Sequence, residues 1–280
     1  MLSTEGGTSS IDWAAYVAGL IPTSGQAPRT ALVVAHPDDE VIGAGAQLPR
    51  FRDLFIFHLT DGAPRDMHDA HAHGFDNWRA YADTRRKELE GAMNLAGIPM
   101  ERLVSLGYPD QEASLHLAEL VQILVKRFSD SKIDLVLTHS YEGGHPDHDA
   151  AAFVVQMACR ILAKSGAPAP SVVEMPFYHS RNGERVVSNF LAHAGSPVSC
   201  AQLSVEQRAL KKKMFECYRT QEAVMRSFST EFECFRKAPD YHFEQSPHEG
   251  KLFYENYAWG MDSAHWRVLA REARQALEQL

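Results

Sequence analysis

Closely spaced cysteines, an excess of basic residues and long apolar runs are all missing from this sequence of 280 residues. The four cysteines, Cys159, Cys200, Cys217 and Cys234, are widely separated and form no CxxC pair. Such spacing favours reduced thiols over a disulfide framework or a thiolate metal site. We therefore expect the four thiols to be reduced.

The charge balance and the lengths of the apolar runs argue against nucleic-acid-binding and membrane-spanning proteins. Lys and Arg number 28 against 36 Asp and Glu, a net charge of −8, whereas binding to nucleic acid needs a basic surface. The most apolar stretch, 150–163, is interrupted by Gln156 and Arg160 and is too short to span a bilayer. Residues 1–10 lack the basic start and apolar run of a signal peptide. We expect a cytoplasmic protein with no stable membrane insertion and no nucleic-acid partner; homo-oligomerisation is left open.

The apolar runs that are present are short and alternate with helical patterns. Residues 31–35 are apolar throughout, which is typical of a strand buried on both faces. Similar runs occupy residues 54–59, 103–106, 135–138 and 172–177, and helical spacing occurs in 78–96, 115–128 and 150–163. This alternation predicts a doubly wound, Rossmann-like, mostly parallel sheet flanked by helices.

The ends of the chain have a different character. Residues 1–29 form a polar leader, and residues 30–280 are interpreted as a single domain. Ser204 and Gln207 form a capping box that predicts a helix through Met225. Aromatic-rich, irregular sequence then leads to a charged amphipathic helix, so a helical and irregular elaboration is expected at the C-terminal end.

Two polar motifs follow predicted strands. The run 31–35 leads directly into His36-Pro37-Asp38-Asp39-Glu40, and the run 135–138 leads through two glycines into His145-Pro146-Asp147-His148. Ligands bind at the carboxyl ends of strands in parallel sheets, so both motifs are expected at one site. Histidine and carboxylate ligands with spare acid and base groups are typical of a catalytic zinc centre. The pattern alone does not choose between His145 and His148 as the ligand.

Together these motifs resemble the LmbE-like (PIG-L) family of zinc-dependent de-N-acetylases. The resemblance extends over roughly residues 30 to 180. It implies a hydrolase that removes an N-acetyl group from an N-acetylglucosamine-type sugar or its conjugate. The expected partner is therefore a small-molecule N-acetylated sugar or glycoconjugate.

The resemblance also implies a role for each motif residue. The zinc ligands correspond to three residues: His36, Asp39 and His148. Asp38 matches the general base that activates water, and His145 matches the residue that stabilises the oxyanion or acts as an acid. Asp147 is placed to tune His145, while Glu40 is expected to have a supporting role.

Weaker matches suggest substrate contacts. Arg85, in an Arg-x-x-Glu pattern with Glu88, resembles an arginine that lies near the substrate, and Asp110 resembles an aspartate that binds sugar hydroxyls. Tyr141 is a third candidate, because it could close over the substrate. The histidines of the 66–73 segment are interpreted as part of a polar loop beside the pocket rather than as a second metal site; they are His68, His71 and His73.

Two other functions remain open from the sequence. Two histidines and one carboxylate also suit Fe²⁺, which would allow oxygen-dependent chemistry instead of hydrolysis. A non-catalytic sugar-binding protein with the same fold is the other alternative, although binding alone does not need Asp38 and His145 beside the metal ligands. The acceptor and the acyl chain length are left open.

Overall fold

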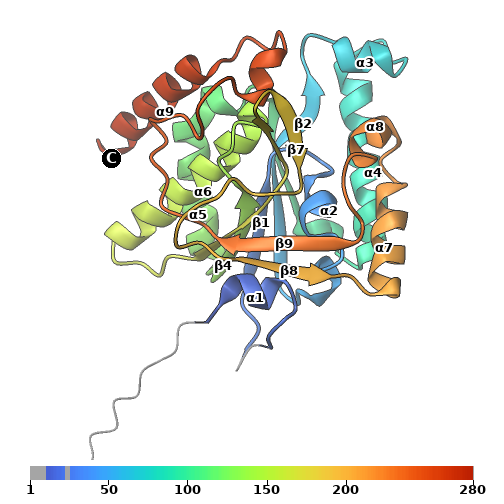
Figure 1. Cartoon of the computed structure of the whole chain (residues 1–280), viewed down its shortest axis with the longest axis horizontal. Helices are drawn as coiled ribbons and strands as arrows, with labels where there is room; N and C mark the ends of the chain where they lie inside the picture. Colours follow the sequence, from blue (N-terminus) through green and yellow to red (C-terminus); the bar gives the residue numbers. More distant parts are fainter. Residues whose placement is uncertain (1–10, 23–25, 280) are drawn as a thin grey trace, which may run out of the picture.

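The central element is a seven-stranded sheet in the order β3-β2-β1-β4-β5-β9-β8 (Figure 1). The computed structural model describes residues 11–22 and 26–279. The strands of this sheet are β1 (Thr30–Val34), β2 (Leu54–Pro64), β3 (Leu103–Asp110), β4 (Leu135–His139), β5 (Ser171–Met175), β8 (Val198–Gln202) and β9 (Phe232–Lys237). The first five strands are parallel, and β9 and β8 extend the sheet in antiparallel pairing. The predicted mostly parallel α/β fold is confirmed.

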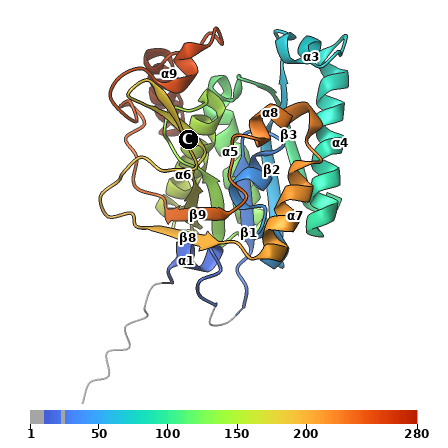
Figure 2. The same cartoon turned by 45° about the vertical axis from the view of Figure 1, so that its right-hand side comes forward.

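Helices cover both faces of this sheet (Figures 1 and 2). The helices α2 (Asp39–Ala44), α4 (Trp78–Ala96) and α7 (Val205–Phe215) contribute to one apolar cluster, and α5 (Leu117–Ser131), α6 (Pro146–Lys164) and α9 (Ser263–Leu277) contribute to the other. Strand β1 supplies Leu32 and Val34 to the first cluster and Ala31 and Val33 to the second. Because successive side chains point to opposite faces, a strand between two helical layers must be apolar throughout.

The remaining elements are short. They are α1 (Trp13–Val17), η1 (Leu48–Arg50), α3 (His68–Ala72), η2 (Met100–Arg102), η3 (Ala113–His116), a hairpin of β6 (Tyr178–Arg181) and β7 (Glu184–Val187), η4 (Arg219–Gln221), α8 (Glu222–Met225) and η5 (Phe253–Asn256). Helix α1 lies in the predicted leader and packs Tyr16 and Val17 into the first apolar cluster. Residues 1–10 and 23–25 of that leader lie outside the described residues. Within the described part of the chain, no helix is both long enough and apolar enough to span a bilayer.

Helix α4 has the bounds that the sequence predicts. The side chain of Asn77 accepts a hydrogen bond from the backbone N–H of Ala80 at 2.9 Å, which caps the first turn. Gly97 ends the helix with φ +72°, a left-handed conformation that suits glycine. Helix α6 instead begins at Pro146, several residues earlier than the apolar periodicity indicates, because proline is favourable in a first turn.

The predicted helix from Ser204 to Met225 is wrong in its second half. The capping box of Ser204 and Gln207 is present, but α7 ends at Phe215 and a short turn separates it from α8. This break buries Tyr218 completely. A continuous helix would carry the phenol along the helix surface, whereas the turn allows it to enter the core.

The expectation of four reduced thiols is also wrong. Cys200 on β8 lies directly opposite Cys234 on β9, and the two form a disulfide, while Cys159 and Cys217 are free. The antiparallel register brings the two Cα atoms within 4.1 Å of each other. Sequence spacing could not reveal this contact, because strand β9 lies in a region that has no recognisable strand pattern.

Candidate active site

The two motifs meet where the neighbouring strands β1 and β4 end. These strands are parallel, with Val33 opposite Thr138, so the residues that follow them emerge at the same edge of the sheet. They line a cavity of about 150 Å³. The six residues predicted as ligands or catalytic groups are all buried: His36, Asp38, Asp39, His145, Asp147 and His148.

His36 lies among three carboxylates. Its Nε2 atom is 3.0 Å from Asp110 Oδ1 and 3.4 Å from Asp147 Oδ2, and its Nδ1 atom is 3.3 Å from Asp39 Oδ2. Burial alone would lower the pKa of His36, but these carboxylates outweigh it and raise the pKa well above its usual range. The centre therefore has an excess of negative charge that favours a cation.

Asp39 connects His36 to two further histidines. Its Oδ1 atom is 3.4 Å from His148 Nε2, and its Oδ2 atom is 3.3 Å from His139 Nε2. Burial opposes ionisation of Asp39, yet the nearby His148 and His139 hold its pKa well below the ordinary value. The ring of His139 also stacks on that of His148 at 4.0 Å. His139, the last residue of β4, thus contacts both groups.

Asp38 has a strained backbone and a side chain held at one oxygen. Its φ of 135° lies in a region that non-glycine residues rarely adopt. Arg85 donates from Nη2 to Asp38 Oδ2 at 3.0 Å and to the Pro37 carbonyl at 2.7 Å, and from Nη1 to the Gly62 carbonyl at 2.6 Å. Burial raises the pKa of Asp38 well above its ordinary value even though Arg85 opposes the shift.

The side chain of Glu40 supports the backbone of Asp38. Its Oε2 atom accepts the Asp38 backbone N–H at 3.1 Å and a hydrogen bond from His58 Nε2 at 2.9 Å. Its Oε1 atom accepts the hydroxyl of Tyr218. The expected supporting role of Glu40 therefore has a geometric basis, and it involves one residue from the C-terminal part of the chain.

His145 is held at its Nδ1 atom by the following turn. This atom accepts the backbone N–H of Asp147 at 3.1 Å, which also caps helix α6. The hydrogen bond assigns the imidazole proton to Nε2, which lies 3.7 Å from Asp110 Oδ1. Burial and the neighbouring His36 lower the pKa of His145 to about 3, so the ring is neutral.

Asp147 is fixed by hydrogen bonds from the backbone. Its Oδ2 atom accepts the N–H of Gln111 at 2.6 Å, and its Oδ1 atom accepts the N–H of Ala113 at 3.0 Å. It therefore ties the start of α6 to the segment that follows β3. Its backbone N–H contacts His145 and its carboxylate faces His36, so it orients both histidines.

Three overlapping groups of side chains have ligand atoms close enough to share one metal ion. They are His36 with His145 and His148; His36 with Asp110, His145 and Asp147; and Asp39 with His139 and His148. Every member is buried. Imidazole and carboxylate donors of this kind suit zinc and ferrous iron. The geometry thus does not separate His145 from His148 as a ligand, and the histidines of α3 belong to none of these groups among the described residues.

The three predicted substrate contacts have different surroundings. Arg85 and Asp110 line the cavity. Tyr141 is buried outside it: its hydroxyl donates to the Gln245 carbonyl at 2.9 Å, and its ring packs 5.1 Å from that of Trp266. The structure therefore does not bring Tyr141 to the cavity.

Other lining residues carry no sequence motif. Asp69 reaches the cavity from α3, so most of the segment interpreted as a polar loop is a short helix. Tyr178, Gln221 and Trp259 also line the cavity. Gln221 is positioned by the turn after α7. That turn is anchored by Glu88 of the Arg-x-x-Glu pattern, which accepts the N–H of Thr220 at 2.9 Å and its hydroxyl at 2.6 Å.

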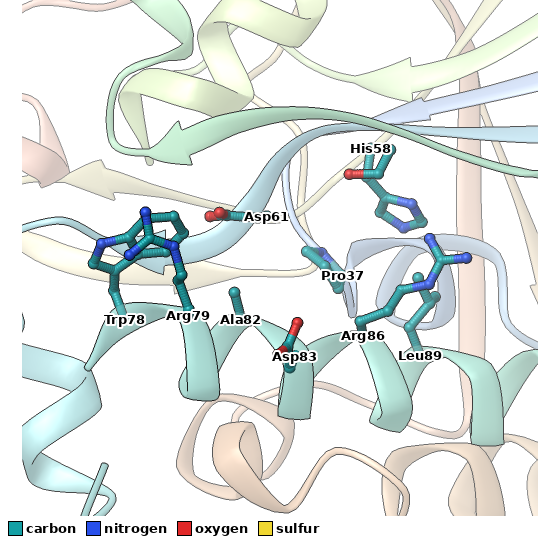
Figure 3. A pocket seen from close by; sticks show the side chains of 10 residues that line it. Pro37, His58, Asp61, Trp78, Arg79, Ala82, Asp83, Arg86 and Leu89 are labelled. Carbon is teal, nitrogen blue, oxygen red and sulfur yellow. The ribbon is translucent and has the colours of Figure 1, made fainter. Parts of the chain in front are cut away.

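A larger cavity of about 470 Å³ lies between α4 and strands β2 and β3 (Figure 3). Pro37 and His58 line it together with a row of α4 side chains that includes Trp78, Arg79 and Arg86. Two of its charged groups are paired locally: Arg86 with Glu90 at 2.8 Å and Asp61 with Arg65 at 2.7 Å. It contains none of the predicted site residues, so we place the chemistry in the smaller cavity.

The fold and the buried histidine–aspartate centre define a Rossmann-like α/β protein with a metal-competent site at the strand ends. The PIG-L family, described as GlcNAc-PI de-N-acetylase, matches residues 31–159. This stretch contains both motifs, so the match confirms their resemblance to that family.

A curated relative and several solved structures are similar to the chain. The 1D-myo-inositol 2-acetamido-2-deoxy-α-D-glucopyranoside deacetylase 2 of Catenulispora acidiphila is 28% identical over 175 residues, which are 51% of this chain and 55% of that protein. The match thus spans about half the length of this relative.

Among solved structures, the A40926 pseudoaglycone deacetylase Dbv21 has a TM-score of 0.57 and 16% identity, over 76% of this chain and 97% of that one. The N,N'-diacetylchitobiose deacetylase of Pyrococcus horikoshii has a TM-score of 0.50 and 18% identity, over 79% and 89% respectively. At such identities the likeness establishes the fold.

Proposed function

We propose that this chain hydrolyses the N-acetyl amide of an amino sugar or its conjugate in a zinc-dependent reaction. The observation that carries the proposal is that Asp38 and His145 line the same cavity as the buried residues His36, Asp39 and His148. A binding protein would need the centre alone, whereas hydrolysis also needs a proton acceptor and an oxyanion donor. The family match and the deacetylase names of the relatives support this choice.

His36, Asp39 and His148 would hold the metal ion. Their donor atoms are two imidazole nitrogens and a carboxylate, a set found in catalytic zinc sites. The three carboxylates around His36 supply negative charge that a divalent cation would compensate. When bound, the ion would polarise the amide carbonyl and lower the pKa of water at the site.

Asp38 accepts the proton of the attacking water. Arg85 binds only its Oδ2 atom, so Oδ1 is available to the cavity. A carboxyl pKa raised by burial brings this group closer to the working pH of a general base. The same carboxyl then returns the proton to the leaving nitrogen, so that water adds to the acyl carbon and the amine leaves neutral.

His145 donates from Nε2 to the carbonyl oxygen as that oxygen gains negative charge. Because Nδ1 is occupied by the Asp147 N–H, the proton stays on the nitrogen that faces the cavity. A neutral donor held in place stabilises an oxyanion without the cost of reorganisation. Arg85 and Asp110 remain our candidates for contacts with sugar hydroxyls.

Amine release and metal content test the proposal together. The purified chain would be assayed with N-acetylglucosamine, its β-linked disaccharide and an inositol-linked conjugate. We expect about one metal per chain, and amine release that a chelator abolishes and Zn²⁺ restores. Asp38→Asn is the matched control and should retain metal but lose turnover.

The two alternatives give different results in the same assay. Oxygen consumption restored by Fe²⁺ and not by Zn²⁺ would favour the oxygen-dependent reading. Saturable sugar binding without amine release, in protein that contains metal, would favour a non-catalytic member of the fold. Protein that holds no metal without chelator treatment would contradict the central proposal.

A further inference from the structure

Four aromatic side chains form an arc along one wall of the catalytic cavity. Trp259 and Tyr178 line the cavity and are the two ends of the arc. Tyr257 and Phe253 lie between them and connect them through ring contacts. The rings of Tyr257 and Trp259 are stacked, with centroids 4.4 Å apart and planes at 10°. Phe253 contacts Tyr257 at 5.6 Å and Tyr178 at 5.3 Å.

Each end of this arc contacts one histidine of the second motif. The Trp259 ring is 4.8 Å from that of His145, and the Tyr178 ring is 5.4 Å from that of His148. A substrate whose amide lies beside these histidines would therefore have the arc next to it. The arc residues come from β6, from η5 and from the loop before α9, all in the part of the chain beyond the family match.

Tyr257 is the accessible member of the arc. The guanidinium of Arg185 lies 4.4 Å from the Tyr178 ring and 5.4 Å from the Phe253 ring, so it covers part of that wall. Trp259 is partly buried beneath Tyr257, which is 46% exposed. An exposed tyrosine that is already stacked on a second ring presents a rigid apolar face to a ligand.

The volume of the cavity indicates what that face contacts. At about 150 Å³ the cavity is smaller than the roughly 300–1,000 Å³ of most ligand pockets. It suits the acyl amide and the ring that carries it, whereas any further ring of a conjugate must lie outside. The apolar face of a pyranose or an aromatic ring packs well against such an aromatic surface.

We propose that Tyr257 and Trp259 form a stacking subsite for the second ring of a glycoconjugate, which makes the preferred substrate larger than a monosaccharide. This inference rests on the proposed deacetylase function. Tyr257 is a specificity residue here, because it contacts the part of the substrate that does not react. Trp259 also touches His145, so its replacement would not separate binding from catalysis.

Calorimetric titration of the full-length Asp38→Asn protein tests the subsite without turnover. N-acetylglucosamine and its β-linked disaccharide are the two probes. We expect the disaccharide to bind about tenfold more tightly, the size of one favourable ring contact. Adding Tyr257→Ala should remove that difference and leave monosaccharide binding unchanged, whereas Tyr257→Phe should preserve it.

Equal affinity for the two probes, or no binding of either, would overturn the subsite. So would a Tyr257→Ala change that weakens both probes by the same factor. If Asp38→Asn fails to fold by circular dichroism, KM for each substrate in the native enzyme and in Tyr257→Ala replaces the titration. Disaccharide-selective binding with no amine release from the native protein would instead reject the proposed function and leave the subsite standing.

Discussion

The Oε2 atom of Glu40 accepts the backbone N–H of Asp38 at 3.1 Å, at a residue whose φ is 135°. A backbone in this region is stable only when its surroundings hold it. Glu40 is held in turn by His58 Nε2 at 2.9 Å and by the Tyr218 hydroxyl. The orientation of the proposed base therefore depends on a buried brace formed by Glu40, His58 and Tyr218.

Removing the Tyr218 hydroxyl should slow the reaction more than it weakens binding. In Tyr218→Phe the Glu40 carboxylate loses one donor and the Asp38 backbone loses part of its support. A small displacement of a catalytic group costs a factor of roughly ten to a hundred in kcat. We expect kcat to fall by about tenfold or more while KM stays within about twofold, as measured by steady-state amine release.

Tyr241→Phe is the matched control for this variant. The Tyr241 hydroxyl also donates to a buried carboxylate, that of Glu174, at 2.9 Å, but neither residue lines the cavity. Both variants should lower the free energy of unfolding by about 1–3 kcal/mol, because each leaves a buried carboxyl oxygen without one of its donors. Equal loss of stability with unchanged kcat in both would show that the brace has no influence on catalysis.

Metal content should show which of the two histidines, His148 or His145, is the metal ligand. Both share a metal-competent group with His36, but only His148 lies within 3.4 Å of Asp39, whereas His145 Nδ1 caps α6. We expect His148→Ala to lose the metal, as measured by atomic absorption after dialysis. His145→Ala should retain it and lose a factor of roughly 100–1,000 in kcat. The reverse pattern would exchange their roles.

Alkylation should detect two free thiols in the unfolded, unreduced protein and four after reduction, because Cys200 and Cys234 form a disulfide. In the folded protein, burial raises the pKa of the Cys159 thiol to about 12, well above the labelling pH of 8. Only a small fraction of this thiol is ionised, so it should resist iodoacetamide. The partly exposed Cys217 should react first, and mass spectrometry of tryptic peptides would show the order. Four labels without reduction would refute the disulfide.

The sequence predicted the parts of the fold whose patterns are local. The run 31–35 became β1, shifted by one residue, and 78–96 became α4 with the same bounds. The two motifs could be joined into one site because parallel neighbouring strands end at the same edge. Local periodicity and strand-end chemistry were sufficient for those inferences.

The contacts that support the site and the sheet could not be predicted from the sequence, because they join residues that lie far apart in the chain. Tyr218 lies 178 positions from Glu40, in a segment that the sequence predicted to be an unbroken helix opened by the capping box of Ser204 and Gln207. Cys200 and Cys234 meet only because of the pairing of β8 with β9. Tyr257 and Trp259 belong to an aromatic-rich region with no regular spacing, so their approach to His145 could not be read from the pattern.

Replacing Gly62 by alanine should disturb Arg85 directly. Gly62 has φ +66°, and a Cβ atom there would lie 2.7 Å from the Arg85 guanidinium. Arg85 would have to move, and its contacts with Asp38 and the Pro37 carbonyl would weaken. We expect a loss of unfolding free energy above the roughly 1 kcal/mol of left-handed strain, and a fall in kcat of about tenfold or more in the amine-release assay.

Gly97→Ala separates this effect from backbone strain alone. Gly97 has a similar φ of +72°, but no neighbouring atom would lie within 4 Å of its Cβ, and it ends α4 away from the cavity. It should lose about 1 kcal/mol of stability in chemical denaturation and retain the native kcat. If Gly62→Ala behaved in the same way, the close approach of Arg85 to Gly62 would have no consequence for Asp38, and the brace of Glu40, His58 and Tyr218 would be sufficient to position the base.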